Sequence, residues 1–351
     1  MSQKKTLKIM TGLIMAIVAI IIYRINYKSN IEVLYFYNWS EYIPDEVIDQ
    51  FTQETGIQVI KTTYDSNEAM FAKMVILKGK GYDLIVPSTY YVQKLYKSDM
   101  LLPIDKSKIK NYNYIDPMFL NKKYDPNNKY SIPYFWGATL IALNKNKVDK
   151  TQVTKWADLW NDKYKNKLML MNDIREVFHI ALAKNGFSGN STNPKEIEIA
   201  YESLKQLMKN VAVFNSDTPF APYIEGNADI GMIWNGSAYT AHKQNPAIDF
   251  VYPEEGAILW IDNLTIPKKA KNVDSAYKMI NFLLRPEIAA KIAINTGYAT
   301  PNKKALELLP DEIKYNDVIY PSKEIFEKGE IQEDIGEAIL IYEKYWQKLR
   351  T

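Results

Sequence analysis

The feature that most constrains the fold of this chain is a regular alternation of strand-like and helix-like segments from residue 31 onward. Residues 31–37 (IEVLYFY) are typical of a β-strand, and residues 44–56 are typical of a helix that begins at Pro44 and ends at Gly56. The series continues with strands over 57–64 and 82–87 and helices over 67–81 and 89–99. Such alternation predicts an α/β fold, in which a largely parallel sheet carries helices on both faces.

A second series of segments follows a polar passage over residues 103–132. Strands are predicted over 138–145, 167–171, 211–214, 228–234, 248–253 and 258–267, and helices over 173–186, 195–210, 273–284, 286–297 and 331–349. The chain has 351 residues, of which 47% are hydrophobic, and this is enough for two globular units. We therefore predict two α/β lobes between which the chain crosses more than once.

The first 30 residues have a different character. Lysines are followed by an apolar run from Ile9 to Tyr23, which is the pattern of an export signal. The run is about 15 residues long, short of a comfortable bilayer span, and no small-x-small cleavage site follows it. We expect a signal or membrane anchor over residues 1–30 and favour an anchor that is not cleaved. The rest of the chain is then expected outside the cytoplasm, in the periplasm or on the outer face of the cytoplasmic membrane, anchored by residues 9–23.

Charge and composition exclude several classes of function. Outside residues 1–30 the chain has 39 basic and 41 acidic residues, so nothing favours nucleic-acid binding. The absence of cysteine excludes a disulfide scaffold, thiol catalysis, cysteine-ligated metals and a lipid-modified cysteine. His179 and His242 have no partner at ligand spacing, and we predict that each lies on a helix surface. We expect no metal and no cofactor.

Two segments combine an aromatic side chain with an acid two positions away. Trp260 and Asp262 lie in a predicted strand, where such residues share one face. Trp39 and Glu41 follow the first predicted strand, together with Ser40 and Tyr42. Ligands of α/β proteins usually bind beyond the carboxyl ends of strands. Both pairs are therefore candidates for a ligand site, although Trp39 could equally pack in a capped loop.

Further candidates also lie at strand ends. Asp173 and Glu176 follow the strand over 167–171 and would lie on one side of the first turn of a helix, but the same spacing is typical of a capping box. The remaining candidates at strand ends and turns are Ser88, Tyr90, Trp234 and Tyr298. Each is individually more often a packing residue, but their common position favours a binding site.

The mixture of acids and aromatic rings indicates the class of ligand. An aromatic face attracts an ammonium group with about 0.5–2 kcal/mol. A carboxylate–ammonium hydrogen bond adds roughly 1.5–3 kcal/mol, and an indole covers methylene groups at about 0.8 kcal/mol each. An aliphatic polyamine can make all three of these interactions at once. The alternatives are a carboxylate-dependent glycosidase, the same fold with a ferric ion, a sugar or a quaternary amine as ligand, and an anchored structural protein.

Six motifs, in one order, resemble those of the extracytoplasmic spermidine/putrescine-binding proteins of bacterial polyamine ABC importers, and among these the spermidine-preferring kind. They are YNWSEYIP, YDLIVPSTYYV, NDIREVF, NSDTPFAPYIEGNADIGMIWNGSA, LWIDNLTIP and NTGYATPN. The resemblance covers nearly the whole chain after residue 31. It implies a two-lobed periplasmic-binding-protein fold with an interlobe ligand cleft and chain crossings near residues 136, 260 and 306. Lobe 1 would comprise residues 31–136 and 261–306, and lobe 2 residues 137–260 and 307–351.

The resemblance also implies a set of ligand contacts. Carried over motif by motif, the acidic contacts are Glu41, Asp173, Glu176 and Asp262, the aromatic walls are Trp39, Tyr42, Tyr90, Trp234, Trp260 and Tyr298, and the polar contacts are Ser40, Ser88, Ser216 and Gln332. Ser40 stands where the family motif has threonine, which keeps the hydroxyl. The resemblance implies a monomer that captures polyamine without catalysis and docks on permease subunits in the membrane. The residues leave spermidine and putrescine both open, with three or four acids favouring the trication.

Overall fold

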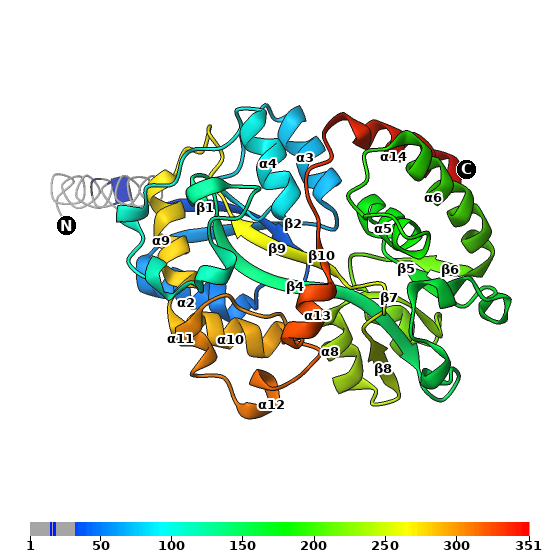
Figure 1. Cartoon of the computed structure of the whole chain (residues 1–351). Helices are drawn as coiled ribbons and strands as arrows, with labels where there is room; N and C mark the ends of the chain where they lie inside the picture. Colours follow the sequence, from blue (N-terminus) through cyan, green and yellow to red (C-terminus); the bar gives the residue numbers. More distant parts are fainter. Residues whose placement is uncertain (1–14, 16, 19–31, 351) are drawn as a thin grey trace, which may run out of the picture.

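The structure is a computed structural model that describes residues 15, 17–18 and 32–350. The signal or anchor predicted over residues 1–30 lies almost wholly outside the described residues and stays a prediction. Of the helices in the described ranges, none has the length and apolar character needed to cross a membrane. Figure 1 shows two α/β lobes joined by two long strands that pass from one lobe to the other, β4 (Ile132–Asn144) and β9 (Ile258–Leu264).

One lobe, called here the first lobe, is built on a parallel three-stranded sheet of order β2-β1-β3. Its elements are β1 (Val33–Trp39), α2 (Asp45–Thr55), β2 (Gln58–Tyr64), α3 (Asn67–Ile76), β3 (Leu84–Ile85), α4 (Thr89–Lys97), α9 (Val273–Leu283), α10 (Pro286–Thr296) and α11 (Lys303–Leu306). Helix α2 ends as predicted at Gly56, whose φ of 74° suits glycine. The side chain of Ser66 caps α3 by accepting a hydrogen bond from the backbone of Ala69.

The second lobe is built around β5 (Leu168–Leu170), β6 (Val211–Phe214), β7 (Ile230–Trp234) and β8 (Ile248–Val251). Its helices include α5 (Ile174–Lys184), α6 (Pro194–Leu207), α7 (Ala221–Ile224) and α8 (Asn235–Gln244). The C-terminal segment adds α12 (Asp311–Lys314), α13 (Lys323–Lys328), β10 (Glu330–Ile331) and α14 (Ile339–Leu349). The strands form a seven-stranded sheet of order β10-β9-β4-β7-β5-β6, in which β8 also pairs with β4.

The prediction of a largely parallel sheet is confirmed for the first lobe but not for the larger sheet. Strands β5 to β7 pair in parallel, whereas β4 is antiparallel to β7, β8 and β9. The physical reason is the path of the chain, because β4 carries it into the second lobe and β9 brings it back. Local alternation of strands and helices contains no information about this return path.

The helix predicted over 67–81 ends early, at Ile76. Three other predicted boundaries are wrong for a reason that depends on strand pairing. Strand β1 extends to Trp39, so that this residue lies within the strand and not after it. Strand β4 begins at Ile132 and not at residue 138, because its first residues pair with the far end of β9. The helix predicted over 331–349 begins only at Ile339, because Glu330 and Ile331 add the short strand β10 to the edge of β9. Each of these three corrections comes from pairing with a strand distant in sequence.

The prediction that His179 lies on a helix surface is also wrong. The side chain is only 2% exposed, and it packs so closely against Gly189 that a Cβ atom there would lie 2.0 Å from Nδ1. Burial lowers the pKa of His179 to about 4, so the ring is neutral near pH 7. His242 is exposed on α8, as predicted.

Candidate functional site

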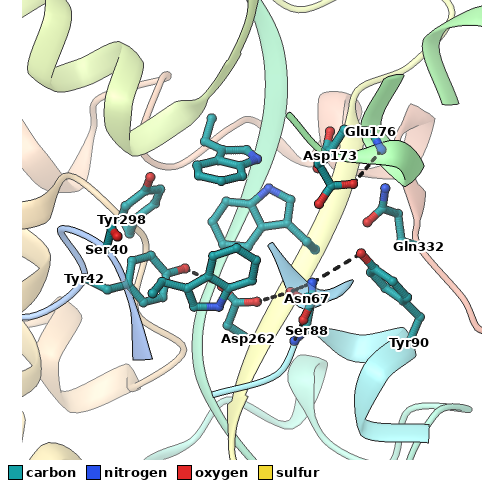
Figure 2. A pocket seen from close by; sticks show the side chains of 13 residues that line it. Ser40, Tyr42, Asn67, Ser88, Tyr90, Asp173, Glu176, Asp262, Tyr298 and Gln332 are labelled. Atoms are coloured by element: carbon teal, nitrogen blue, oxygen red, sulfur yellow. Dashed lines mark hydrogen bonds between the residues drawn. The ribbon is translucent and has the colours of Figure 1, made fainter. Parts of the chain in front are cut away.

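A narrow cavity lies between the two lobes. Its lining residues are Trp39, Ser40, Tyr42, Asn67, Ser88, Tyr90, Asp173, Glu176, Trp234, Trp260, Asp262, Tyr298 and Gln332. In the first lobe they come from β1 and the turn after it, from the starts of α3 and α4 and from the loop after α10. The others come from the start of α5, the end of β7, β9 and the segment after β10. In Figure 2, Asp173 and Glu176 lie together on one side, Asp262 lies on another, and indole rings stand between them.

Asp262 forms one acidic end of the cavity. It lies on β9, is 4% exposed and accepts hydrogen bonds from the Tyr42 hydroxyl and the Ser88 hydroxyl. Burial raises the pKa of Asp262 to about 7, and the two hydrogen bonds counteract this rise because they stabilise the carboxylate. Near neutral pH this group therefore changes its charge readily in response to a bound cation.

Asp173 and Glu176 form the second acidic end. Asp173 caps α5, because its Oδ1 accepts hydrogen bonds from the backbone N–H groups of Arg175 at 2.9 Å and Glu176 at 3.1 Å. The helix-cap reading is thus correct for Asp173, and the carboxyl also lines the cavity. Both acids are 3% exposed. Burial raises the pKa of each, and the charge of Asp173 raises that of Glu176 further.

One carboxylate oxygen at the second acidic end lacks a hydrogen-bond donor. Oε2 of Glu176 is buried and has no hydrogen-bond partner within the described part of the chain. Buried polar atoms of this kind are nearly always paired in folded proteins. An ammonium group entering the cavity would supply both the missing donor and the missing positive charge.

Aromatic rings form the walls between the acidic ends. The Trp39 and Trp234 rings lie 5.7 Å apart at 79°, and the Trp260 and Tyr298 rings lie 5.6 Å apart at 68°. Trp39 is held by a hydrogen bond of 2.9 Å from its Nε1 to the carbonyl of Val86. These edge-to-face arrangements leave ring surface available to a narrow aliphatic chain.

Two glycines allow the rings to take these positions. Gly137 on β4 pairs with Trp260 on β9, and a Cβ atom on Gly137 would lie 2.5 Å from the Trp260 ring. A Cβ atom on Gly236 would lie 2.5 Å from the Tyr298 ring. Because real Cβ atoms do not approach rings so closely, any side chain at either position would displace the aromatic wall.

Gln332 reaches the cavity from the segment after β10. Its backbone N–H donates to the carbonyl of Leu259 at 3.1 Å, and its carbonyl accepts a hydrogen bond of 2.6 Å from the Thr89 hydroxyl. Its side-chain Nε2 is buried and has no partner among the residues that the structure describes. The segment after β10 thus holds a polar group at the cavity while it contacts β9 and α4.

All but two of the predicted site residues line the cavity; the exceptions are Glu41 and Ser216. Glu41 occupies a left-handed turn with φ of 56°, and its side chain is exposed. It lies close enough to raise the pKa of Tyr298, although burial is the main cause of that rise. Ser216 is buried, and its hydroxyl accepts the backbone N–H of Asn172 at 2.8 Å, so it supports the loop that carries Asp173.

Asn67 lines the cavity and was not among the predicted residues. Its Nδ2 donates to the Ser88 hydroxyl at 3.0 Å and to the Tyr90 hydroxyl at 3.2 Å, and its Oδ1 accepts the backbone N–H of Ser88 at 3.1 Å. It therefore orients two other lining residues. Its position just after β2 follows the same strand-end rule that identified the other candidates, but its segment contains no aromatic–acid pair.

Within the described ranges, no group of three or more histidine and acidic side chains is arranged to hold a metal ion. The features at this site are instead two sets of buried carboxyls, several aromatic rings and neutral polar groups. This combination suits an organic cation that carries more than one positive charge.

Comparison with known proteins places the chain in a family. A family model described as bacterial extracellular solute-binding protein matches residues 46–320. The chain belongs to this family. The family consists of solute-binding proteins, and the curated relatives described next are named as binding proteins, so the comparisons give no support to a glycosidase.

Two curated relatives are named spermidine/putrescine-binding periplasmic proteins. The protein of Escherichia coli is 55% identical over 318 residues, which cover 91% of each chain. The protein of Salmonella typhimurium is 53% identical over 325 residues, which cover 93% of each chain. A solved structure described as a putative spermidine/putrescine ABC transporter from Listeria monocytogenes matches with a TM-score of 0.88 and 37% identity, covering 91% of this chain and 99% of that one.

Proposed function

We propose that this protein is an extracytoplasmic receptor that captures a polyamine in the interlobe cavity and delivers it to the permease of an ABC importer. The observation that carries the proposal is the placement of buried carboxyls at two separate places in one aromatic-walled cavity. Relatives of high identity carry names that specify binding of spermidine and putrescine outside the cytoplasm. Capture involves no chemical step.

The two acidic ends are matched to separated ammonium groups. At one end, Asp262 accepts hydrogen bonds from two hydroxyls and can accept a further bond from an ammonium. At the other end, Asp173 and Glu176 together can neutralise a second ammonium, with Oε2 of Glu176 as an unoccupied acceptor. Methylene groups between the charged ends would lie against Trp260 and the other rings. Because buried charges are costly unless they are paired, the carboxyls favour a polycation over a neutral sugar.

Ligand binding is proposed to close the two lobes. A ligand that contacts Asp173 in the second lobe and Asp262 on β9 stabilises the closed form more than any open form, and this shifts the population. We propose the division into residues 31–136 with 261–306 and 137–260 with 307–351, supported by the passage of β4 and β9 between the lobes. Small-angle scattering should then show compaction at saturating ligand, and an unchanged radius of gyration would contradict closure.

Spermidine is the proposed preferred ligand. Asp262, Asp173 and Glu176 provide three carboxyls in one cavity, which suits a trication better than the dication putrescine. The names of the E. coli and S. typhimurium relatives include both amines. The ratio of the two affinities decides between them.

The protein is proposed to work as a monomer tethered through residues 9–23, with the remaining chain on the outer side of the membrane. The sequence pattern of that segment supports tethering, and the extracellular setting of the family supports the outer location. Detection of a mature N-terminus near residue 30 in the native protein would instead indicate a cleaved signal.

Isothermal titration of the purified full-length protein with spermidine, putrescine and a neutral sugar tests the function. We expect binding of one amine per chain at micromolar affinity or tighter, no binding of the sugar, and weakened binding by Asp173→Asn. The control variant Asp125→Asn changes a buried acid outside the cavity lining and should keep the wild-type affinity. Failure of a folded, ligand-free protein to bind either amine would refute the proposal.

A further inference from the structure

Asn67, at the start of α3, lines the cavity but uses its amide hydrogens within the protein. Its side chain is buried, at 2% exposure. An amide nitrogen carries two hydrogens, and here one is donated to the Ser88 hydroxyl at 3.0 Å and the other to the Tyr90 hydroxyl at 3.2 Å. A lining residue whose donors are both taken by neighbours is placed to act on a ligand through those neighbours.

The backbone of Ser88 fixes the orientation of this amide. The Ser88 N–H lies 3.1 Å from Oδ1 of Asn67, and a backbone N–H can only donate a hydrogen bond. The atom that faces it must therefore be the amide oxygen, because the amide nitrogen in its place would set two donors against each other. Nδ2 of Asn67 then faces the two hydroxyls, and each hydroxyl accepts one of its hydrogens.

The Ser88 hydroxyl extends this arrangement to Asp262. It is buried, and it contacts Nδ2 of Asn67 on one side and Oδ1 of Asp262 on the other. Because it accepts from Asn67, its single hydrogen is left for Asp262, which is its only acceptor among the residues that the structure describes. The Tyr42 hydroxyl donates to the other carboxylate oxygen, Oδ2. Figure 2 shows the resulting row of hydrogen bonds, from Tyr90 through Asn67, Ser88 and Asp262 to Tyr42.

The direction of these hydrogen bonds matters because a serine hydroxyl can either donate or accept. As a donor, the Ser88 hydroxyl stabilises the carboxylate of Asp262, which is the form that binds an ammonium group. As an acceptor, it would stabilise the protonated carboxyl instead. Asn67 occupies the accepting side of the hydroxyl and so favours the carboxylate. Hydrogen bonds in series also polarise one another, so donation from Asn67 makes Ser88 a stronger donor.

The other titratable groups that face Asp262 are four buried tyrosines, Tyr42, Tyr64, Tyr124 and Tyr298. Burial raises the pKa of each of them, and the charge of Asp262 raises it further, so all four are neutral near pH 7. Glu41, which also acts on Tyr298, is exposed. Burial raises the pKa of Asp262 itself to about 7, and the hydrogen bond from Ser88 opposes that rise. A change in this hydrogen bond should therefore alter the pH dependence of ligand binding.

We propose that Asn67 is a positioning residue for the ammonium group at Asp262, because it holds the Ser88 hydroxyl as a donor to that carboxylate. The inference rests on the proposed function, and it adds to the residues that set polyamine affinity one whose amide hydrogens are both used by its neighbours. Loss of the Nδ2 donor frees the Ser88 hydroxyl to turn away or to accept a hydrogen bond from a protonated Asp262. Polyamine affinity then falls although Asn67 gives no hydrogen bond to the ligand.

A double-mutant cycle with Ser88→Ala tests this role on the full-length protein. Spermidine is titrated by calorimetry at pH 7 into wild type, Asn67→Leu, Ser88→Ala and the double variant. We expect Asn67→Leu to raise the Kd about three- to tenfold in the wild-type background and less than about twofold in the Ser88→Ala background. The bond from the Ser88 backbone N–H to Asn67 is available in both backgrounds, so a purely structural role of Asn67 would weaken binding equally in both.

The pH profile of binding supplies a second readout. The pH below which spermidine affinity declines should rise by roughly 0.5–1 unit in Asn67→Leu and in Ser88→Ala alike, because both variants lose the directed hydroxyl. The matched control is Asn210→Leu. Asn210 is a buried asparagine of the second lobe, outside the cavity lining, and its Nδ2 also donates two hydrogen bonds, at 3.0 Å to the carbonyl of Leu159 and at 3.1 Å to that of Asn161. This control should keep the wild-type affinity and pH profile.

If Asn67→Leu does not fold, Asn67→Ala replaces it in the cycle. An equal loss of affinity in both backgrounds, no loss in the wild-type background, or a pH profile that matches wild type would overturn the role of Asn67 while leaving the binding function intact. Failure of the wild-type protein to bind spermidine would overturn the function itself.

Discussion

The substitution Asp262→Asn should separate ligand affinity from the stability of the ligand-free protein, because it changes the two in different directions. It removes the negative charge while it keeps the size of the side chain. Asp262 is 4% exposed and accepts the Tyr42 and Ser88 hydroxyls, and its pKa is about 7 because it is buried. The carboxylate therefore favours a bound ammonium but is costly when the cavity holds no cation.

The expected loss of affinity follows from the charge. A charge-assisted hydrogen bond contributes about 1.5–3 kcal/mol, which corresponds to a Kd increased by roughly 10- to 150-fold. Asparagine can still accept from one hydroxyl and donate to the other. Affinity should therefore fall although the local geometry of Tyr42 and Ser88 is retained.

The expected effect on stability follows from the pKa. The pKa of Asp262 rises from an ordinary value of 3.8 to about 7 on folding, so the folded state holds its proton more tightly than the unfolded state. The free energy of unfolding therefore falls as pH rises from about 4 to about 7, by up to roughly 4 kcal/mol for this group. The Asp262→Asn variant has no carboxyl at this position, so its free energy of unfolding does not fall with pH for this reason. Even if it forfeits about 1 kcal/mol of hydrogen bonding, the ligand-free variant should be at least as stable as wild type at pH 8.

Titration calorimetry with spermidine and urea unfolding at pH 5 and pH 8 measure the two effects. Asp125→Asn is the matched control, because Asp125 is a buried acid with a raised pKa that accepts hydrogen bonds from Lys129, Tyr130 and Ser131 outside the cavity. The control should keep its affinity, because Asp125 does not line the cavity. Wild-type affinity of Asp262→Asn, or a stability of this variant at pH 8 below that of wild type, would refute the reasoning.

Three further outcomes are expected. Acidification from pH 8 to pH 6 should weaken polyamine binding, by up to about tenfold per pH unit for each proton that the ligand displaces. Calorimetry in two buffers of different ionisation enthalpy should detect proton release on binding. An affinity that does not change with pH would contradict the raised pKa values of the cavity acids. Gly137→Ala should weaken spermidine binding and destabilise the protein by about 1–3 kcal/mol, because the added Cβ would overlap the Trp260 ring. Unchanged affinity in a calorimetric titration with spermidine would argue against Trp260 as a ligand wall. Glu41→Gln should cost less than tenfold in affinity, since an exposed ion pair contributes about 0–1 kcal/mol, and a loss as large as that of Asp262→Asn would show that Glu41 closes over the ligand.

Much of the site follows from the local sequence. The period of a strand places Trp260 and Asp262 on one face, and both line the cavity. The period of a helix places Asp173 and Glu176 on one side of the first turn of α5, and both line the cavity as well. The alternation of strands and helices likewise predicts the α/β class and the parallel sheet of the first lobe. These features depend on residues a few positions apart, which is the range over which backbone geometry acts.

Only the tertiary structure decides those features of the fold and the site that depend on residues far apart in the sequence. The antiparallel pairing of β4 with β9, the addition of β10, the burial of His179 and the inclusion of Asn67 all depend on partners far along the chain. Ser88 and Asp262, for example, are separated by 174 positions and become hydrogen-bonded only because the returning strand β9 lies beside the segment that follows β3. Glu41 has the same local signal as Asp262, yet a left-handed turn directs it to solvent. Local sequence determines which side chains share a face, whereas the packing of the two lobes determines which faces meet and lose contact with water.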